Sequence, residues 1–237
     1  MALNAPAVLR SQGIWHLAKS AAKEMRLHSK NTVGTFVARK IASGRKFRYD
    51  GEEYDYLVHK YNMTWSNERA VEIPIFSKMV RRATGRVLEV GNVLSHYVQV
   101  NHDVIDRYEK SPTVLNADAE TYRANHLYSL IISISTIEHI GFDETHRDSR
   151  KVERTLDNLK SMLAAGGILA VSVPMGYNSH LDRRIREHAI EFSELRCLKR
   201  DGFMRWSETP YGDGGSNGGW QRGNLRTERI LLATYRH

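Results

Sequence analysis

The side chains with the clearest capacity for chemistry in this sequence follow a series of short apolar runs. Asp106 and Asp118 each follow such a run, and His139 follows the most apolar run of all. The carboxyl ends of strands in an open α/β sheet share one crevice, so we expect these residues to lie close together. A carboxylate at Asp106 could accept two hydrogen bonds from a ribose diol, and Asp118 could accept one from an exocyclic adenine amine. The pattern therefore predicts a crevice that binds a nucleoside.

Short buried strands are needed to bring these side chains together. In the first of them, Val87, Leu88 and Val90 form a β-branched-rich run interrupted by Glu89 and ended by Gly91, where the absent side chain would let a ligand approach the backbone. We expect further strands over residues 103–108, 114–115, 127–134, 168–173 and 229–235, weaker ones over 192–197 and 203–206, and helices over 66–83 and 152–163. We expect Gly166 and Gly167 to stop the second helix. This alternation predicts a parallel sheet with right-handed crossovers.

Length and composition set bounds on the class of protein. A chain of 237 residues fits one α/β domain with an appendage, and 41% hydrophobic and 26% charged residues are ordinary for a globular protein. Cys197 is the only cysteine, which excludes an intrachain disulfide and makes a cytoplasmic setting the natural expectation. No apolar run approaches the ~18 to 20 residues that a membrane span requires.

The formal net charge of +8 is concentrated at the N-terminus. Residues 1–48 hold ten Lys or Arg against one acid, Glu24, which is a net charge of +9, so residues 49–237 carry −1. We therefore divide the chain into a basic N-terminal helical arm, residues 1–48, and a nearly neutral body, residues 49–237. A neutral body argues against an enzyme with a nucleic-acid substrate, whose groove would need to be positive.

The N-terminal arm contains one segment with helical spacing. Ser11 could cap a helix with apolar residues on one face and a basic stripe on another, namely Lys19, Lys23, Arg26 and Lys30. Three uses of this stripe stay open: a solvated face on a helix packed against the body, an interfacial helix touching acidic lipid headgroups or a glycolipid substrate, or a nucleic-acid or partner contact. Residues 31–50 are interpreted as a polar, basic connector. The sequence does not determine an oligomeric state.

Five segments in order, VLEVGN, VIDRY, LNADAE, LIISISTIEHI and LKSMLAAGGILAVSVP, resemble the motifs of class I S-adenosylmethionine-dependent methyltransferases. The resemblance covers Thr84 to Pro174. It implies a doubly wound, Rossmann-like, seven-stranded and mostly parallel sheet, whose last strand over 229–235 is antiparallel. It also implies a cofactor site in which Glu89, Gly91 and Asn92 face the methionine moiety, Asp106 the ribose, Asp118 and Ala119 the adenine, while Ser135 borders the methyl group.

The sequence departs from the family pattern after the first strand. Residues 92–96 contain no further glycine, and the spacing from Gly91 to Asp106 is shorter than usual. There is also no G-x-G-x-x-G run to receive a pyrophosphate, which argues against a dinucleotide site. S-adenosylmethionine and its product S-adenosylhomocysteine have no phosphate and do not require one.

The segments YNMTWSNERAVEIPI, ISTIEHIGFDE and VPMGYN look most similar to a bacterial subgroup associated with sugar and glycan modification. This resemblance implies O-methylation of a sugar hydroxyl on a small-molecule or glycan acceptor. We expect acceptor contacts from aromatic and polar side chains, namely Tyr61, Trp65, Arg69, Tyr177, Asn178 and Trp206. Core-edge packing explains the cluster around residues 61–69 nearly as well. The glycine-rich loop over 211–224 could fold over the bound acceptor as a lid.

Methyl transfer to a hydroxyl benefits from a general base. His139 is the first candidate, because it follows the fourth strand at the crevice and an unperturbed imidazole titrates near neutrality. A Glu138–His139 pair could instead only hold the loop, and His180 with Asp182 forms the alternative base pair. Glu138, His139 and Asp143 could also help to bind a divalent metal, although we favour a site without one.

Three other functions stay open at this point. One is a natural-product O- or N-methyltransferase with a non-sugar acceptor. Another is a non-catalytic module that keeps the methyltransferase fold and docks through its basic arm. An RNA methyltransferase would predict binding that collapses between low and moderate salt even after residues 1–48 are removed.

Overall fold

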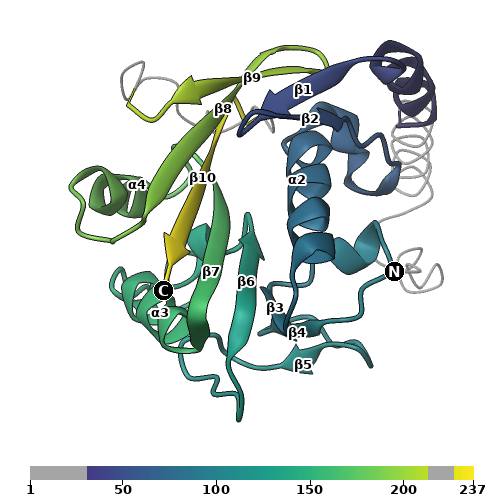
Figure 1. Ribbon diagram of the computed structural model, residues 1–237. Helices are drawn as coiled ribbons and strands as arrows, with labels where there is room; N and C mark the ends of the chain where they lie inside the picture. The colour runs from purple at the N-terminus through teal and green to yellow at the C-terminus, as the bar shows by residue number, and fades with distance from the viewer. Residues whose placement is uncertain (1–30, 213–226) are drawn as a thin grey trace, which may run out of the picture.

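The computed structural model describes residues 31–212 and 227–237. The described chain is built around an eight-stranded sheet with the order β5-β4-β3-β6-β7-β10-β8-β9 (Figure 1). Its strands are β3 (Val87–Val90), β4 (Asp103–Asp106), β5 (Leu115–Asn116), β6 (Tyr128–Ile134), β7 (Leu163–Pro174), β8 (Glu194–Gly202), β9 (Arg205–Pro210) and β10 (Arg229–Arg236). The first five are mutually parallel, and β10 runs antiparallel to both β7 and β8. The expected doubly wound, mostly parallel sheet with an antiparallel last strand is confirmed.

The chain reverses its direction of travel across the sheet between β3 and β6. From β3 it moves outward through β4 to β5, and it then returns to place β6 on the other side of β3. Such a switch point leaves a crevice at the carboxyl ends of the two central strands. All four residues of β3 are buried, Glu89 among them, as in a strand covered on both faces.

Helices cover both faces of the sheet. They are α2 (Arg69–Arg82), α3 (Lys151–Ser161) and α4 (Ser179–Arg186), with short 3-10 helices η1 (Tyr61–Ser66), η2 (Leu94–His96) and η3 (Ile137–His139). Leu130 and Ile132 of β6 pack in the core that contains α2, whereas Ile131 packs in the core that contains α3 and α4. This alternation along one strand divides the interior into two cores. Among the described residues, no helix is both long and apolar enough to cross a membrane.

The segment interpreted as a connector is structured, which corrects that expectation. Residues 31–42 are helical, and β1 (Lys46–Tyr49) pairs with β2 (Glu52–Asp55) in an antiparallel hairpin. Asp50 and Gly51 form its turn, both with positive φ, and Asp-Gly is a favoured pair for a tight hairpin turn. Phe47 and Tyr49 are buried against the body, and the expected boundary at residues 48/49 falls inside this hairpin.

Two further boundaries differ from the sequence prediction. The sheet has eight strands rather than seven, because β8 and β9 form a hairpin in which both weaker strand candidates take part. Gly166 and Gly167 do not end α3. The helix ends at Ser161, and both glycines lie inside β7, where a side chain on Gly167 would meet the carbonyl oxygen of Tyr128 at 2.9 Å. The predicted helix over residues 11–30 and most of the glycine-rich loop lie outside the described residues.

Candidate active site

A cavity of about 330 Å³ opens at the carboxyl ends of the parallel strands. Five of the residues predicted to bind the cofactor or to act as the base line it together: Gly91, Asp106, Asp118, Ala119 and His139. A larger hollow of about 550 Å³ lies at the opposite end of β3 and β4, beside Arg86 and Asn101. We place the site in the smaller cavity, because the strand ends converge there and it is lined by four of the seven predicted cofactor-binding residues and by His139.

Gly91 is required at the floor of this cavity by its own conformation. Its φ is +86°, and its amide donates to the carbonyl oxygen of Ile105 at 2.8 Å. A Cβ at this position would collide with the Thr136 hydroxyl and lie 2.7 Å from Thr136 Cγ2. The glycine therefore accommodates a neighbouring protein side chain as well as leaving the backbone open to a ligand.

Asp106 is held rigidly at the end of β4. Its Oδ1 accepts from the amides of Tyr108 at 2.8 Å and Glu109 at 2.7 Å, and its Oδ2 accepts from the amide of Asn92 at 3.2 Å. A carboxylate oxygen can accept two hydrogen bonds, so Oδ2 retains capacity for a ligand hydroxyl. These contacts orient the carboxylate at the cavity wall.

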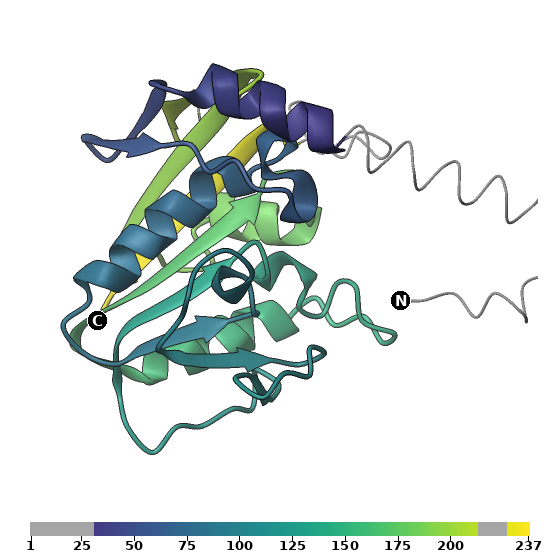
Figure 2. The ribbon, with the colours of Figure 1, turned by 90° about the vertical axis from the view of Figure 1, so that its right-hand side faces the viewer.

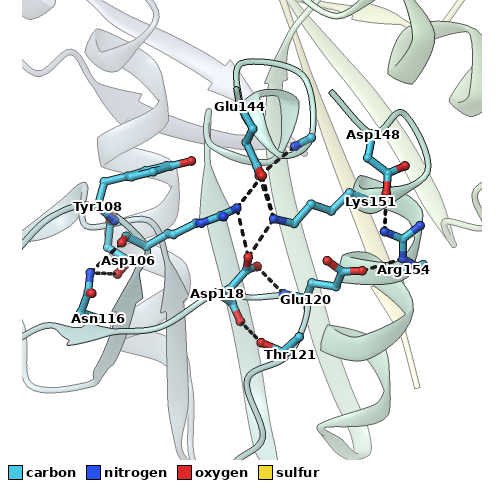
Figure 3. Close-up of polar contacts among 12 residues, drawn as sticks. Asp106, Tyr108, Asn116, Asp118, Glu120, Thr121, Glu144, Asp148, Lys151 and Arg154 are labelled. Atoms are coloured by element: carbon cyan, nitrogen blue, oxygen red, sulfur yellow. Dashed lines mark hydrogen bonds and ion pairs between the residues drawn. The ribbon is translucent and has the colours of Figure 1, made fainter. Parts of the chain in front are cut away.

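Asp118 belongs to a network of four charged side chains, shown in Figure 3. Lys151 Nζ donates to Asp118 Oδ2 at 2.7 Å and to Glu144 Oε1 at 2.8 Å, while Arg107 Nη1 lies 3.1 Å from Asp118 Oδ2 and 2.5 Å from Glu144 Oε2. Burial raises the pKa of Asp118, but the hydrogen bond from Lys151 and the nearby cations outweigh it, so the net pKa is lowered. The ionised carboxylate keeps Oδ1 within reach of a ligand, with one bond from the Glu120 amide at 3.0 Å.

Ala119 and the loop that carries it are fixed from α3. Asn158 Nδ2 donates to the carbonyl oxygen of Ala119 at 2.8 Å and to that of Tyr122 at 2.9 Å. The backbone after β5 is thus positioned by a buried amide side chain, and Ala119 itself lines the cavity.

Glu89 lies behind the cavity wall and not on its surface. Its Oε1 accepts from the amides of Val93 at 2.9 Å and Leu94 at 2.8 Å, and its Oε2 lies 2.8 Å from His102 Nε2. The Glu89 side chain has no exposed surface. Its carboxylate fixes the turn after β3 by accepting these two amide hydrogen bonds, and this turn contains no further glycine after Gly91. Asn92 is likewise engaged with protein, since its Nδ2 donates to Glu109 Oε1 at 2.7 Å.

Ser135 also faces the interior. Its hydroxyl donates to Glu72 Oε1 at 2.6 Å, and its amide donates to Ser172 Oγ at 3.1 Å. The residue adopts a φ of +38°, which turns the chain sharply after β6. Thr136, the next residue, lines the cavity in its place.

His139 sits at the cavity edge between two carboxyl groups. Its Nδ1 makes a short hydrogen bond with Asp143 Oδ2, and Tyr177 donates its hydroxyl to the same oxygen at 2.5 Å. Burial raises the pKa of Asp143, but the hydrogen bonds from His139 and Tyr177 outweigh it and lower the net pKa. The rings of His139 and Tyr177 meet edge to face at 4.7 Å between centroids. This arrangement orients the imidazole through Nδ1.

Two buried glutamates lie near the end of β6, where Glu72 accepts from Ser135 and Glu138 precedes His139. Glu72 pairs with Arg69 Nη1 at 2.8 Å, and Glu138 Oε1 lies 3.6 Å from His139 Nε2. Both carboxyls are almost fully buried, and desolvation raises both pKa values, that of Glu138 by the larger amount. Glu138 Oε2 has no hydrogen-bond partner among the described residues.

The alternative base pair is not brought to the cavity. His180 Nδ1 contacts Arg183 Nη2 at 3.2 Å and lines a separate surface hollow beside Glu153, whereas Asp182 Oδ2 accepts from the amide of Gly176 at 2.8 Å. The two side chains have different partners, and neither lines the cavity of His139. The geometry therefore favours His139 as the base.

Most of the predicted acceptor residues have structural contacts that do not depend on a ligand. Asn178 caps α4 and donates to the Glu138 carbonyl oxygen at 2.9 Å, and Arg69 pairs with Glu72. Trp206 is only 4% exposed, in the core beside β1 and β2. Tyr177 packs against the His139 ring.

The remaining two predicted acceptor residues are aromatic and lie elsewhere. Trp65 packs against Phe203 with ring centroids 5.9 Å apart, and a side chain on Gly34 would collide with its indole. Tyr61 stacks on His96 with centroids 4.6 Å apart and is half-exposed. Neither lines the cavity.

Sequence reasoning missed Arg107, Glu144 and Lys151. All three are charged residues, and each has a partner that is distant in sequence or on another element; Lys151 and Asp118, for example, are 33 residues apart. The sequence signal that could have found Glu144 is its place in the GFDE segment, directly after Asp143. No group of three or more His, Cys, Asp or Glu among the residues described in the structure is arranged to hold a metal.

Comparison with known proteins finds likeness in structure only. No protein-family model and no curated protein matches the sequence. Among solved structures, the N-methyltransferase NodS from Bradyrhizobium japonicum WM9, bound to S-adenosyl-L-homocysteine, is 17% identical with a TM-score of 0.42 over 67% of this chain and 81% of that one. A possible histamine N-methyltransferase from Thermotoga maritima is 15% identical with a TM-score of 0.40, over 66% of this chain and 84% of that one.

A third similar structure is an amino pentose methyltransferase from Micromonospora echinaspora. It is 16% identical with a TM-score of 0.32, and the match covers 45% of this chain and 50% of that one. All three of these proteins are methyltransferases or possible methyltransferases. Because the identities and TM-scores are low, we base the function on the geometry of the cavity.

Proposed function

We propose that this protein is an S-adenosylmethionine-dependent methyltransferase that O-methylates a hydroxyl group of a sugar or glycan precursor. The observation that carries the proposal is the convergence of Gly91, Asp106, Asp118 and His139, from four successive loops, on one cavity. Asp106 and Asp118 offer fixed carboxylates for a ribose diol and an adenine amine. The apolar contacts of a nucleoside are offered by Ile105, which also lines the cavity.

The residues around the cavity suit this cofactor better than a phosphate-bearing one. Four acidic residues line it, namely Asp106, Asp118, Asp143 and Glu144. The amides of Val93 and Leu94 after β3 donate to the Glu89 carboxylate, so they are not free to bind a phosphate. When bound, S-adenosylmethionine would supply a methyl group already activated on a sulfonium. The protein then has to align the acceptor and remove its proton.

His139 is the group proposed to remove that proton. Asp143 holds the Nδ1 side of the imidazole and is itself kept ionised by the Tyr177 hydroxyl and by His139. Nε2 would then accept the proton of the acceptor hydroxyl, and Asp143 would stabilise the resulting imidazolium, as in other oriented histidine bases. The half-exposed position of His139 leaves its edge open to an acceptor.

The test is a methyl-transfer assay with S-adenosylmethionine and a panel of sugars, glycan precursors and amines, read by mass spectrometry. His139→Ala should lower the methylation rate by ~10² or more while leaving cofactor affinity nearly unchanged. His126→Ala, at the opposite end of β6, is the matched control and should keep the rate. An unaltered rate in His139→Ala, or a loss in His180→Ala instead, would contradict the assignment of the base.

An amine is the second candidate acceptor. The observation that favours it is the partly exposed Asp143 carboxylate, which lines the cavity beside His139 and whose net pKa is lowered by its hydrogen bonds from His139 and Tyr177. Negative charge there would attract a protonated amine. An N-methylated product, with no O-methylated product from any sugar, would select this alternative while retaining the cofactor assignment.

A further inference from the structure

The helix over residues 31–42 has an unusual distribution of side chains. Its inward face carries small residues, with Ala38 and Thr35 buried and Gly34 packed against the Trp65 indole. Its outward face carries large apolar residues, since Val33 is 59% exposed, Phe36 59% and Val37 43%. Residues three and four apart share a face of a helix, so these three form one stripe. The helix thus presents its larger apolar side chains to solvent.

The segment that carries and follows this stripe is basic. Residues 31–48 contain five Lys or Arg and no acid, and all five are exposed: Arg39, Lys40, Arg45, Lys46 and Arg48. Lys40 Nζ lies over the Phe36 ring, 4.9 Å from its centroid, and Lys46 forms a loose pair with Glu53 at 3.6 Å. Figure 2 shows the helix at one edge of the molecule, beside β1. Arg39 and Lys40 therefore lie on the same helix as the apolar stripe, and the other three cations follow it in the turn and in β1.

We propose that the outward face of residues 31–42 docks on an anionic lipid bilayer, with Val33, Phe36 and Val37 inserted among the headgroups and the flanking cations paired with lipid phosphates. An apolar face bordered by Lys and Arg is the pattern of a helix that lies in a membrane interface. Anionic headgroups also attract clustered Lys and Arg. This docking surface is separate from the cavity and does not depend on the proposed reaction.

Charge distinguishes the bilayer from other occupants of the stripe. A second copy of this chain, joined through the same face, would oppose five cations with five more. Residues 1–30 would also bring further positive charge to the stripe, because they contain five Lys or Arg against one acid, Glu24. A bilayer containing acidic lipid supplies both the apolar interior and the opposite charge that the stripe lacks.

The test uses the full chain in co-sedimentation with vesicles of phosphatidylcholine alone and of an equal mixture of phosphatidylcholine and phosphatidylglycerol. We expect binding to the mixed vesicles only, weakened by salt. The double variant Val33→Ser/Phe36→Ser should bind about tenfold more weakly or worse, because it removes apolar side chains that insert. Arg39→Gln/Lys40→Gln should also weaken binding and reduce its salt dependence.

The matched control is Leu115→Ser/Leu127→Ser, which removes two apolar side chains that are 55% and 56% exposed on another part of the surface. It should bind like the original chain. Equal binding by the Val33→Ser/Phe36→Ser variant would overturn the proposal and assign any vesicle binding to other residues. Absence of binding to mixed vesicles would overturn it too. If light scattering shows that the original chain is a dimer and the Val33→Ser/Phe36→Ser variant a monomer, the stripe is occupied by a second copy of the chain instead of a bilayer.

Discussion

Replacing Gly91 with alanine should destabilise the protein for two separable reasons. The backbone at this residue has a φ of +86°, and left-handed conformations cost a residue with a side chain about 1–2 kcal/mol. The new Cβ would also collide with the Thr136 hydroxyl and lie 2.7 Å from Cγ2, and overpacking of this kind costs about 1–3 kcal/mol. Against a typical stability of about 5–15 kcal/mol, a combined loss of about 2–5 kcal/mol is easily measured.

Urea denaturation of a double-mutant cycle distinguishes the two contributions. Thr136→Ala removes the two closest atoms and leaves its Cβ at 3.0 Å, although it also removes the hydrogen bond from Thr136 Oγ1 to the Ile134 carbonyl oxygen. The Gly91→Ala/Thr136→Ala protein should therefore recover about 1–2 kcal/mol relative to the sum of the single changes. Strict additivity would refute the collision, and a Gly91→Ala protein within about 0.5 kcal/mol of the original would refute both contributions.

Two further changes test the buried carboxylates. Glu138→Gln should raise the free energy of unfolding relative to the original protein, and by more at higher pH. Because burial raises the pKa of Glu138, the folded state favours the protonated carboxyl. This contribution to the stability of the original protein is therefore fully present below the unfolded pKa near 4.5 and is lost as the pH rises through the folded pKa, whereas glutamine does not titrate. Urea unfolding at pH 5 and pH 8 measures the difference, and an equal effect at both would count against it. Glu89→Ala should cost about 2–6 kcal/mol, because the amides of Val93 and Leu94 lose their acceptor in a buried turn. Thermal unfolding checks this, with Glu187→Ala, an exposed glutamate, as the control expected to change little.

The sequence was sufficient to predict the parallel half of the sheet, because β3 and β6 are buried on both faces and therefore appear as apolar runs. The convergence of Asp106, Asp118 and His139 was predictable for the same reason, since strand ends in such a sheet meet in one crevice. The hairpin of β1 and β2 was missed although Asp50-Gly51 is a hairpin turn signal flanked by alternating aromatic and polar residues.

The role of individual side chains was less predictable, because it depends on burial and on partners far away in sequence. Trp206 is an aromatic residue of the kind that binds a sugar acceptor, but its side chain is buried in the core beside β1 and β2. Glu89 lies next to the site in sequence, yet its carboxylate is already hydrogen-bonded to two backbone amides and to His102. Lys151 sits on α3 and reaches a loop that only the folded sheet brings within 2.7 Å.

The central claim is that the cavity beside β3, β4 and β5 binds S-adenosylmethionine, and calorimetric titration tests it most directly. We predict binding of S-adenosylmethionine and S-adenosylhomocysteine and no binding of NAD. Asp106→Ala should weaken the binding of both sulfur nucleosides. Asp157 is an exposed acid on α3, and Asp157→Ala should leave their binding unchanged. Absence of binding by either sulfur nucleoside, or unchanged binding in Asp106→Ala, would contradict the account and favour a non-catalytic module.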